Sequence, residues 1–149
     1  MSTKIGIISD THGILRPKVL DTLKDCDYIL HAGDFAEESV LDQIRFLGNL
    51  YVVKGNSDRW WADYLADKQQ FRIEDLNFVL LHDRQMLGSE AEEADVIVYG
   101  HTHKFAEEVI DGRLWLNPGS CGLSRFGEPL TFAVMDVDGR DYTVRRIGL

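Results

Sequence analysis

The order of the apolar segments in residues 4–56 constrains the fold of this chain more than any other feature of its sequence. Short apolar runs at 4–10, 28–34 and 50–56 alternate with two segments, 16–27 and 37–48, whose apolar residues recur at helical spacing. The first helical segment begins at a proline and the second ends at a glycine, as helices commonly do. A strand–helix–strand–helix–strand order implies parallel strands that are joined by right-handed helical crossovers.

The second half of the chain has a different pattern. Residues 71–83 are typical of a hairpin, and 94–103 contains a buried strand. Asp111–Gly112 and Asp138–Gly139 lie between apolar or alternating runs, as two-residue hairpin turns do. We therefore expect an α/β half followed by a mostly antiparallel half. Because no linker or repeat separates the halves, we expect two packed sheets in one domain over residues 1–149.

Composition argues against several classes of function and location. The formal net charge of -9 argues against non-specific binding to nucleic acid or to an anionic membrane, since both require a basic surface. Two cysteines, Cys26 and Cys121, are too few for a disulfide framework, and we interpret them as reduced thiols. No segment approaches the ~20 apolar residues of a membrane span, and the first apolar run is too short for a signal peptide. We expect a cytoplasmic location.

Polar side chains that can bind metal follow the predicted strands at the points where the strands end. Seven such residues occur in chain order: Asp10, His12, Asp34, Asn56, His82, His101 and His103. In open α/β sheets, ligands collect at the carboxyl ends of the strands. If the strands are neighbours, these seven side chains converge on one place.

Each of these residues also has a simpler explanation. Asp34 is suited to capping the helix that begins near Glu37, and a single histidine near a core edge, such as His82, is usually structural. We interpret His31, which is not one of the seven, as packed or hydrogen-bonded rather than catalytic. The pair His101 and His103 is a stronger signal, because alternate residues on an extended segment point the same way, about 6.6 Å apart. The joint pattern favours a metal centre, since four of the five histidines fall at predicted strand ends.

The donor types narrow the choice of metal. Imidazole, carboxylate and amide donors without thiolate favour Mn, Fe, Zn, Co or Ni over a structural zinc or a copper(I) site. Seven donors exceed what one ion needs when water must also bind, so we expect two divalent ions, with manganese the first choice. Such ions lie ~3.5–4 Å apart and share a bridging group. His101 and His103 can then each hold a different ion, although one ion can also take both.

The ordered set of motifs resembles that of the calcineurin-like metallophosphoesterases, in particular the small bacterial and archaeal phosphodiesterases. The motifs are D-x-H (10–12), G-D (33–34), G-N-x-D (55–58), H (82), G-H-T-H (100–103) and N-P-G-S…R-x-G within 116–127. The resemblance implies a four-layer α/β/β/α sandwich of two mixed sheets, with the metals at the strand ends. It also extends to the retromer subunit that keeps this fold and is largely a scaffold, and a catalytically weak metal-binding scaffold is therefore the alternative function.

The resemblance also implies roles for the seven residues. Asp10, His12 and His103 would hold the first ion, Asn56, His82 and His101 the second, and Asp34 would bridge them. A hydroxide activated by the two ions would then attack the phosphorus of a small-molecule phosphate ester, most simply a diester. Asp34, Asn56 and His101 are the expected catalytic residues. Two divalent ions, two carboxylates and one hydroxide sum to about +1, so the site attracts phosphate inside an acidic protein.

Two positions depart from the family pattern. Ser57 stands where larger members carry a histidine that assists the transition state or protonates the leaving group. A general acid typically contributes about 10²–10⁴-fold, so its absence favours esters with good leaving groups. Asp83 follows His82 where the family usually has glycine, which places a second carboxylate beside that ligand.

Several further residues are candidates for supporting roles. Asp58 is expected to orient Asn56 or Ser57, and Arg125 to contact a phosphate, with a structural salt bridge as the equal alternative. Trp60 or Trp61 can stack on a substrate, although a core contact or a self-association patch is the favoured interpretation. Formation of a homo-oligomer is left open.

Overall fold

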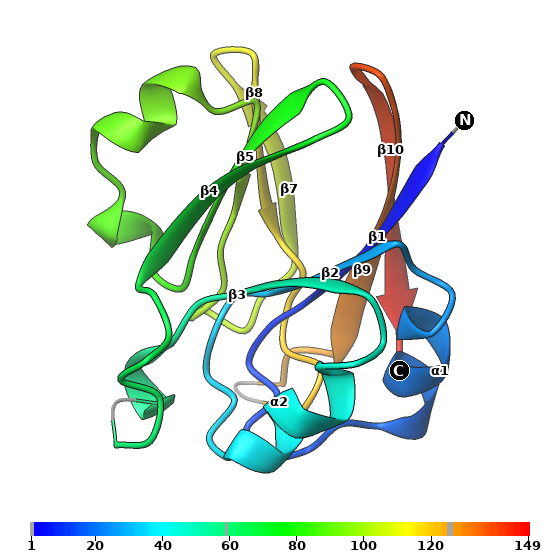
Figure 1. Ribbon diagram of the computed structural model, residues 1–149, viewed down its shortest axis with the longest axis vertical. Helices are drawn as coiled ribbons and strands as arrows, with labels where there is room; N and C mark the ends of the chain where they lie inside the picture. The colour runs from blue at the N-terminus through cyan, green and yellow to red at the C-terminus, as the bar shows by residue number, and fades with distance from the viewer. Residues whose placement is uncertain (1, 59, 125–126) are drawn as a thin grey trace.

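The structure, a computed structural model, describes residues 2–58, 60–124 and 127–149. Over these residues the chain forms two mixed five-stranded sheets that pack face to face (Figure 1). The predicted α/β sandwich of two mixed sheets is confirmed. Arg125 and its predicted phosphate contact lie outside the described residues.

The first sheet has the strand order β10–β9–β1–β2–β3. Its strands are β1 (Thr3–Ile8), β2 (Tyr28–His31), β3 (Asn49–Val52), β9 (Thr131–Asp138) and β10 (Asp141–Gly148). β1, β2 and β3 pair in parallel, as the alternating pattern predicts, because a helix connects each strand to the next. The crossovers are α1 (Pro17–Leu23) and α2 (Glu38–Ile44), which are shorter than predicted because turns after each helix return the chain to the sheet.

The second sheet has the strand order β4–β5–β6–β8–β7. Its strands are β4 (Lys68–Ile73), β5 (Leu76–Leu81), β6 (Val96–Val98), β7 (Ala106–Ile110) and β8 (Arg113–Asn117). The β4–β5 and β7–β8 hairpins are antiparallel, whereas β6 pairs in parallel with both β5 and β8. The expectation of a mostly antiparallel second half was therefore wrong for the centre of this sheet.

One hairpin closes at the predicted Asp111–Gly112 turn, and the β9–β10 hairpin closes one residue later than predicted, at Gly139 and Arg140, because Asp138 pairs with Asp141. Asp111 and Gly112 both adopt positive φ angles, 53° and 77°, as a type I′ turn requires. Gly139, with a φ of 63°, opens the turn between β9 and β10. That second hairpin joins the first sheet, where β9 pairs antiparallel with β1.

Three apolar clusters define the layers of the sandwich. The largest lies between the sheets and joins residues such as Ile5 and Leu30 of the first to Phe78 and Leu116 of the second. The second cluster lies between the first sheet and the helices α1 and α2 (Figure 1). The third covers the outer face of the second sheet, and Leu87 from the segment of short 3₁₀ turns packs on it. These turns, η2 (Arg84–Met86) and η3 (Ser89–Glu93), form the thin fourth layer.

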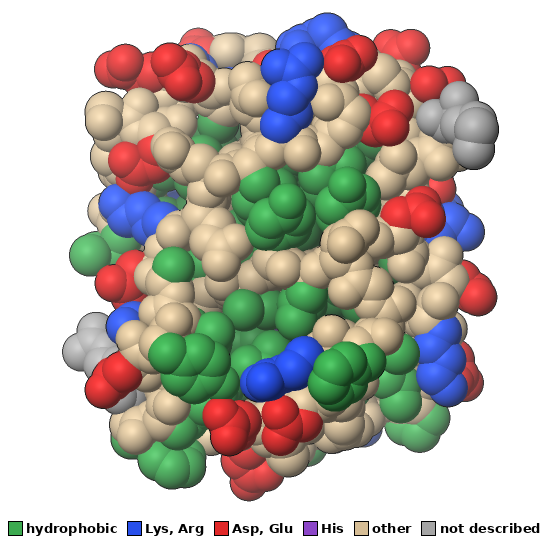
Figure 2. Space-filling view, in the orientation of Figure 1, with side chains coloured by type: hydrophobic (Ala, Val, Ile, Leu, Met, Phe, Trp, Pro, Cys, Tyr) green, Lys and Arg blue, Asp and Glu red, His purple; other side chains and the backbone are tan. Residues whose placement is uncertain are grey.

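The distribution of surface charge and the state of the two cysteines agree with what the composition predicts. On the face seen in Figure 2, Lys and Arg side chains are scattered among acidic ones rather than gathered into a basic patch. Cys26 and Cys121 are free and buried, and burial raises the pKa of their thiols to about 11 and about 12. Among the described residues, no helix is long and apolar enough to cross a membrane.

Candidate metal centre

The loops that follow β1 and β2 run side by side beyond the end of the first sheet. The backbone N–H of Asp10 donates to the carbonyl oxygen of Gly33 (3.0 Å), and that of His12 donates to the carbonyl oxygen of Asp34 (3.0 Å). These bonds extend the contact between the two strands into their loops. They bring the D-x-H motif next to the carboxylate of Asp34.

Four of the predicted ligands form one compact group. Asp10, His12, Asp34 and His103 each offer a ligand atom within 4.8 Å of the others. His103 Nε2 lies 3.4 Å from Asp10 Oδ1, and His12 Nε2 lies 3.8 Å from both Asp10 Oδ1 and Asp34 Oδ2. Three of the four are buried and His12 is partly so. The group is a candidate metal-binding site.

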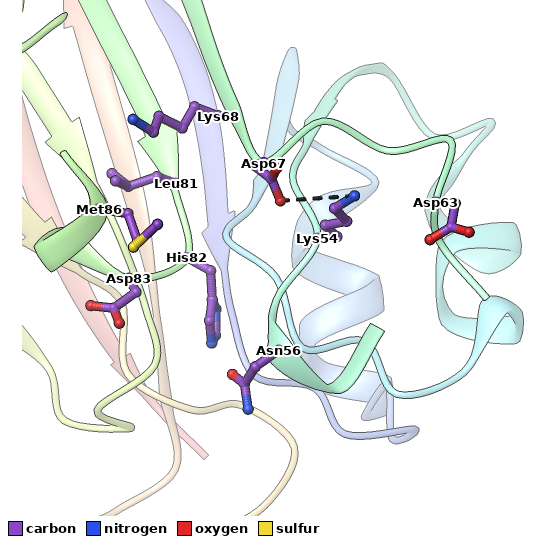
Figure 3. Close-up of a pocket in the computed structure, with 9 residues that line it drawn as sticks. All are labelled: Lys54, Asn56, Asp63, Asp67, Lys68, Leu81, His82, Asp83 and Met86. Atoms are coloured by element: carbon purple, nitrogen blue, oxygen red, sulfur yellow. Dashed lines mark ion pairs between the residues drawn. The ribbon is translucent and has the colours of Figure 1, made fainter. Parts of the chain in front are cut away.

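A second set of predicted ligands meets the first at Asp34. His82 Nε2 lies 3.3 Å from Asp34 Oδ2, and His101 Nδ1 lies 3.3 Å from His82 Nε2. His82 Nδ1 is hydrogen-bonded to the carbonyl oxygen of Ala32 (2.8 Å), which orients Nε2 toward the carboxylate. Asn56 lines a cavity beside His82 (Figure 3). All seven predicted residues thus lie at the same end of the sandwich.

Both sheets contribute predicted ligands to this end of the molecule, four from the first and three from the second. Asp10, His12, Asp34 and Asn56 follow strands of the first sheet, and His82, His101 and His103 follow strands of the second. The arrangement follows the rule that sites form at the carboxyl ends of parallel strands.

Five of the seven predicted ligands have a left-handed backbone. The residues and their φ angles are Asp10 (55°), His12 (46°), Asp34 (63°), His101 (73°) and His103 (65°). Such angles are uncommon outside glycine and cost about 1–3 kcal/mol each. Strained residues persist where the surrounding structure holds them, and they concentrate at functional sites.

The expected extended geometry of the G-H-T-H segment was wrong. β6 ends at Val98, and both histidines lie beyond it in left-handed conformations. His101 turns toward His82, whereas His103 turns toward His12, with 3.3 Å between the ring nitrogens in each pair. The two imidazoles therefore face different groups, which favours one ion for each of them.

Contacts from distant segments produce this turn. The N–H of Gly100 donates to the carbonyl oxygen of His82 (2.9 Å), and Asn117 Nδ2 donates to the carbonyl oxygen of Gly100 (3.1 Å). Ser120 Oγ donates to the carbonyl oxygen of Asp10 (3.0 Å). The N-P-G-S segment thus supports the loops of Asp10 and Gly100 from outside.

Asp58 holds the loop of Asp34 rather than Asn56 or Ser57, which corrects its predicted role. Its buried carboxylate accepts hydrogen bonds from four backbone N–H groups. The donors are Asp34 (2.8 Å), Gly55 (2.9 Å), Ala36 (2.9 Å) and Phe35 (3.2 Å). The reason is the 3₁₀ turn η1 (Asn56–Asp58), which directs the carboxylate back toward the first sheet.

Ser57 acts on Asp34. Its backbone N–H and its hydroxyl both donate to Asp34 Oδ1, at 2.9 and 3.0 Å. Burial raises the pKa of Asp34, but hydrogen bonds from His82 and Ser57 outweigh it and hold the pKa well below its ordinary value. Asp34 is therefore ionised at neutral pH, with Oδ1 occupied by Ser57 and Oδ2 directed at the histidines.

Asp10 provides the test of whether a cation fits. Its Oδ2 accepts hydrogen bonds from Ser9 Oγ (2.7 Å) and from the N–H of His101 (3.2 Å). Its Oδ1 is buried and accepts no hydrogen bond from any described residue, although it faces His12 and His103. A buried carboxylate oxygen surrounded by imidazole nitrogens fits a divalent ion of the group from Mn to Zn.

The remaining candidates have structural roles or lie at the edge of the site. His31 is buried, stacks on Phe35 with 3.6 Å between ring centroids, and burial lowers its pKa to about 3, so its predicted structural role is confirmed. Trp61 packs edge-on against Phe35, whereas Trp60 is 76% exposed. Asp83 accepts a hydrogen bond from the backbone N–H of Gln85 in η2 (3.0 Å), as a helix cap does.

Sequence reasoning missed two lysines near the site. Lys54 and Lys68 line the cavity beside Asn56 and His82 (Figure 3). Lys54 could have been predicted from the sequence, because it directly precedes the G-N motif. Lys68 could not, because it lies far from every motif in the sequence.

Comparison with known proteins identifies the family. Residues 3–140 match the calcineurin-like phosphoesterase superfamily domain. The chain belongs to this superfamily. A probable metallophosphoesterase from Methanothermobacter thermautotrophicus is 33% identical to this chain, and the match covers 91% of this chain and 86% of the relative. The relatives' names describe phosphate-ester hydrolases, so the chain is placed with a family of hydrolases that need divalent metals.

Solved structures share the fold of this metallophosphoesterase homologue. The structure titled as a novel archaeal phosphodiesterase has a TM-score of 0.74 and 29% identity, covering 98% of this chain and 99% of that one. The Vps29 protein of Entamoeba histolytica, solved with Zn²⁺, has a TM-score of 0.78 and covers 97% of this chain and 98% of its own. Its identity is 23%, so this second likeness shows the fold alone.

Gly55 permits the close approach of the Asp34 loop, and alanine at this position is expected to weaken metal binding. A Cβ atom on Gly55 would lie 2.9 Å from the carboxyl carbon of Asp34, so that carboxylate must move. We expect Gly55→Ala to lower the affinity for Mn²⁺ at least about tenfold and to destabilise the fold by about 1–3 kcal/mol. Calorimetric titration and urea denaturation measure the two effects.

Gly148→Ala is the matched control, because a Cβ atom there meets nothing within 4 Å. It should bind Mn²⁺ as the unmodified protein does. Equal affinity in Gly55→Ala would contradict the close approach as an essential feature of the site.

Proposed function

We propose that this protein is a binuclear metal-dependent phosphodiesterase that acts on a small-molecule phosphate ester. Asp34 carries the proposal, because its Oδ2 lies 3.8 Å from His12 Nε2 and 3.3 Å from His82 Nε2. One carboxylate oxygen thus faces both groups of predicted ligands, as the bridge between two ions must.

The proposed ligand sets follow from these two groups. Asp10, His12 and His103 would hold one ion, Asn56, His82 and His101 would hold the other, and Asp34 would serve both. When bound, the ions supply an activated hydroxide and stabilise the negative charge that develops on the phosphate. Manganese is our first choice among the metals that suit these donors.

The chain's own residues divide into buried and accessible ones. Asp10, Asp34 and His103 are buried, so their donor atoms lie where water is largely excluded. Asn56 and His101 are exposed. We propose that these two side chains contact the phosphate oxygens of the substrate as well as the second ion. Asp34, Asn56 and His101 are accordingly the proposed catalytic residues.

Ser57 supports a preference for esters with good leaving groups. Because its hydroxyl donates to Asp34 Oδ1, Ser57 is not available to protonate a leaving group. We expect turnover of bis-p-nitrophenyl phosphate to exceed that of an alkyl phosphate monoester by at least about 10²-fold, the smaller end of what a general acid contributes. Steady-state rates with added Mn²⁺ measure the ratio. Comparable rates on the two esters would count against this assignment.

Metal dependence tests the proposed function itself. Turnover of bis-p-nitrophenyl phosphate should be lost after chelation and restored by Mn²⁺. A protein that binds two ions without hydrolysing any phosphate ester would instead be the metal-binding scaffold of the alternative interpretation.

We also propose that residues 1–149 act as one domain in the cytoplasm. The apolar cluster between the sheets, which joins strands from β1 to β10, supports a single domain. The free thiols of Cys26 and Cys121 agree with a reducing compartment.

A further inference from the structure

A cavity of about 550 Å³ lies beside the proposed metal centre (Figure 3). Asn56 and His82 lie at one end of it, and the segment after β3, the start of β4 and the end of β5 form its walls. Its volume falls within the range of about 300–1,000 Å³ that is typical of small-molecule sites. A diester bound at the centre has room here for one of its two substituents.

Charged side chains dominate the lining of this cavity. The charged residues are Lys54, Asp63, Asp67, Lys68 and Asp83, and the apolar ones are Leu81 and Met86. Two of the carboxylates already have partners, because Asp83 caps η2 and Asp67 pairs with Lys54. An anion can therefore bind in this acidic cavity only where it displaces a carboxylate from one of the two lysines.

The two lysines differ in how firmly they are paired. Lys68 Nζ lies 2.6 Å from Glu90 Oε1, and this hydrogen bond is the main cause that lowers the pKa of Glu90 to about 2. Lys54 Nζ lies 3.8 Å from Asp67 Oδ1, beyond hydrogen-bond distance, and the Asp67 side chain is 79% exposed. Solvent screens such a pair, so it is weak. Lys54 is thus the lysine that can exchange its partner.

The position of Lys54 is restricted even though its pairing is weak. Its side chain is only 21% exposed, and its backbone N–H donates to the carbonyl oxygen of Ala66 (3.0 Å). It precedes Gly55 and the proposed ligand Asn56, so the backbone from which the side chain extends lies next to the centre. A partly buried lysine has less side-chain freedom to lose when it binds an anion than a fully exposed one has.

We propose that Lys54 is a specificity-determining residue that binds a second anionic group of the substrate. The substrate class is then a phosphodiester with one substituent that carries a terminal phosphate. This inference rests on the proposed phosphodiesterase function. The metal centre holds the phosphate that is hydrolysed, and the ammonium of Lys54 exchanges Asp67 for the terminal phosphate.

Two dinucleotides that differ only in a 5′-terminal phosphate, pApA and ApA, test the inference on the Mn²⁺-loaded protein. We expect kcat/KM for pApA to exceed that for ApA about tenfold, as one charge-assisted contact supplies. Lys54→Met should remove this preference, mainly through KM, and Lys54→Arg should restore most of it. Lys68→Met is the matched control. It should retain the preference for pApA because the ammonium group of Lys68 is already paired with Glu90.

Bis-p-nitrophenyl phosphate separates this inference from the function on which it rests. If that ester is hydrolysed but pApA and ApA react equally or not at all, Lys54 does not select a terminal phosphate. The same conclusion follows if Lys54→Met keeps the preference. Loss of turnover with all three substrates in the metal-loaded protein would overturn the phosphodiesterase function as well.

Discussion

His103→Ala is expected to lower the turnover of bis-p-nitrophenyl phosphate more than about 100-fold and to reduce the bound metal from two ions to one or fewer. Replacing a residue that hydrogen-bonds to a metal ligand lowers metal affinity or activity by about 10–100-fold, and replacing a ligand itself has a larger effect. His103 is buried, and its Nε2 faces Asp10 Oδ1 at 3.4 Å. Its removal leaves the Asp10 carboxylate without one of the imidazoles that complete the cation site. Elemental analysis of the dialysed protein and steady-state kinetics measure the two losses.

Lys104→Ala is the control for this substitution, because Lys104 is the exposed neighbour of His103 and contacts the loop through its backbone N–H. This variant should bind two ions and retain activity. A His103→Ala protein that still bound two ions and reacted at the original rate would remove His103 from the ligand set.

Asp58→Ala is expected to lower the free energy of unfolding by about 3–5 kcal/mol in the metal-free protein. The substitution leaves four backbone N–H groups in and near the Asp34 loop without their acceptor, and each such buried group costs about 1–3 kcal/mol. The sum is reduced because the loop can move toward water. Urea denaturation at neutral pH measures the change, and metal affinity should fall with it because Asp34 loses its support.

Asp58→Asn should lie between the unmodified protein and Asp58→Ala, since it retains one acceptor oxygen. Asp42 serves as the control because its side chain is 61% exposed and pairs with Arg45 on the surface. Asp42→Ala should change the free energy of unfolding by no more than about 0.5 kcal/mol. If Asp58→Ala lowered the free energy of unfolding by less than about 1 kcal/mol, the four hydrogen bonds of Asp58 would not be what holds the Asp34 loop in its conformation.

The parallel part of the fold could be predicted from sequence because its cause is local. Each of the first two strands in residues 4–56 is connected to the next strand by a helix with one apolar face, and such a unit has essentially one way to fold. The β9–β10 hairpin was different. Its strands were recognisable, but the choice of β1 as partner depends on which apolar face is buried in the assembled core, and strand pattern alone does not determine that choice.

The donors at the site were predictable by type, whereas their orientation was not. Asp10 and Asp34 were found because each ends an apolar run in the sequence, two and three residues beyond the ends of β1 and β2 at Ile8 and His31. The backbone of His101 and His103 depends on Asn117 and on the packing of Gly100 against Ser9, contacts that span many residues of sequence. The target of Asp58 likewise depends on a three-residue turn, whose direction a motif does not encode.

The division of the donors between the two sheets has a mechanical consequence. Loops of the first sheet carry four of the seven, and loops of the second carry three. Ions held by both sets would cross-link the two sheets at the end that carries the site. They would add to the stability that the apolar cluster between the sheets provides. Metal binding would thus make the loops at this end of the sandwich more rigid and would slow the movement of one sheet relative to the other.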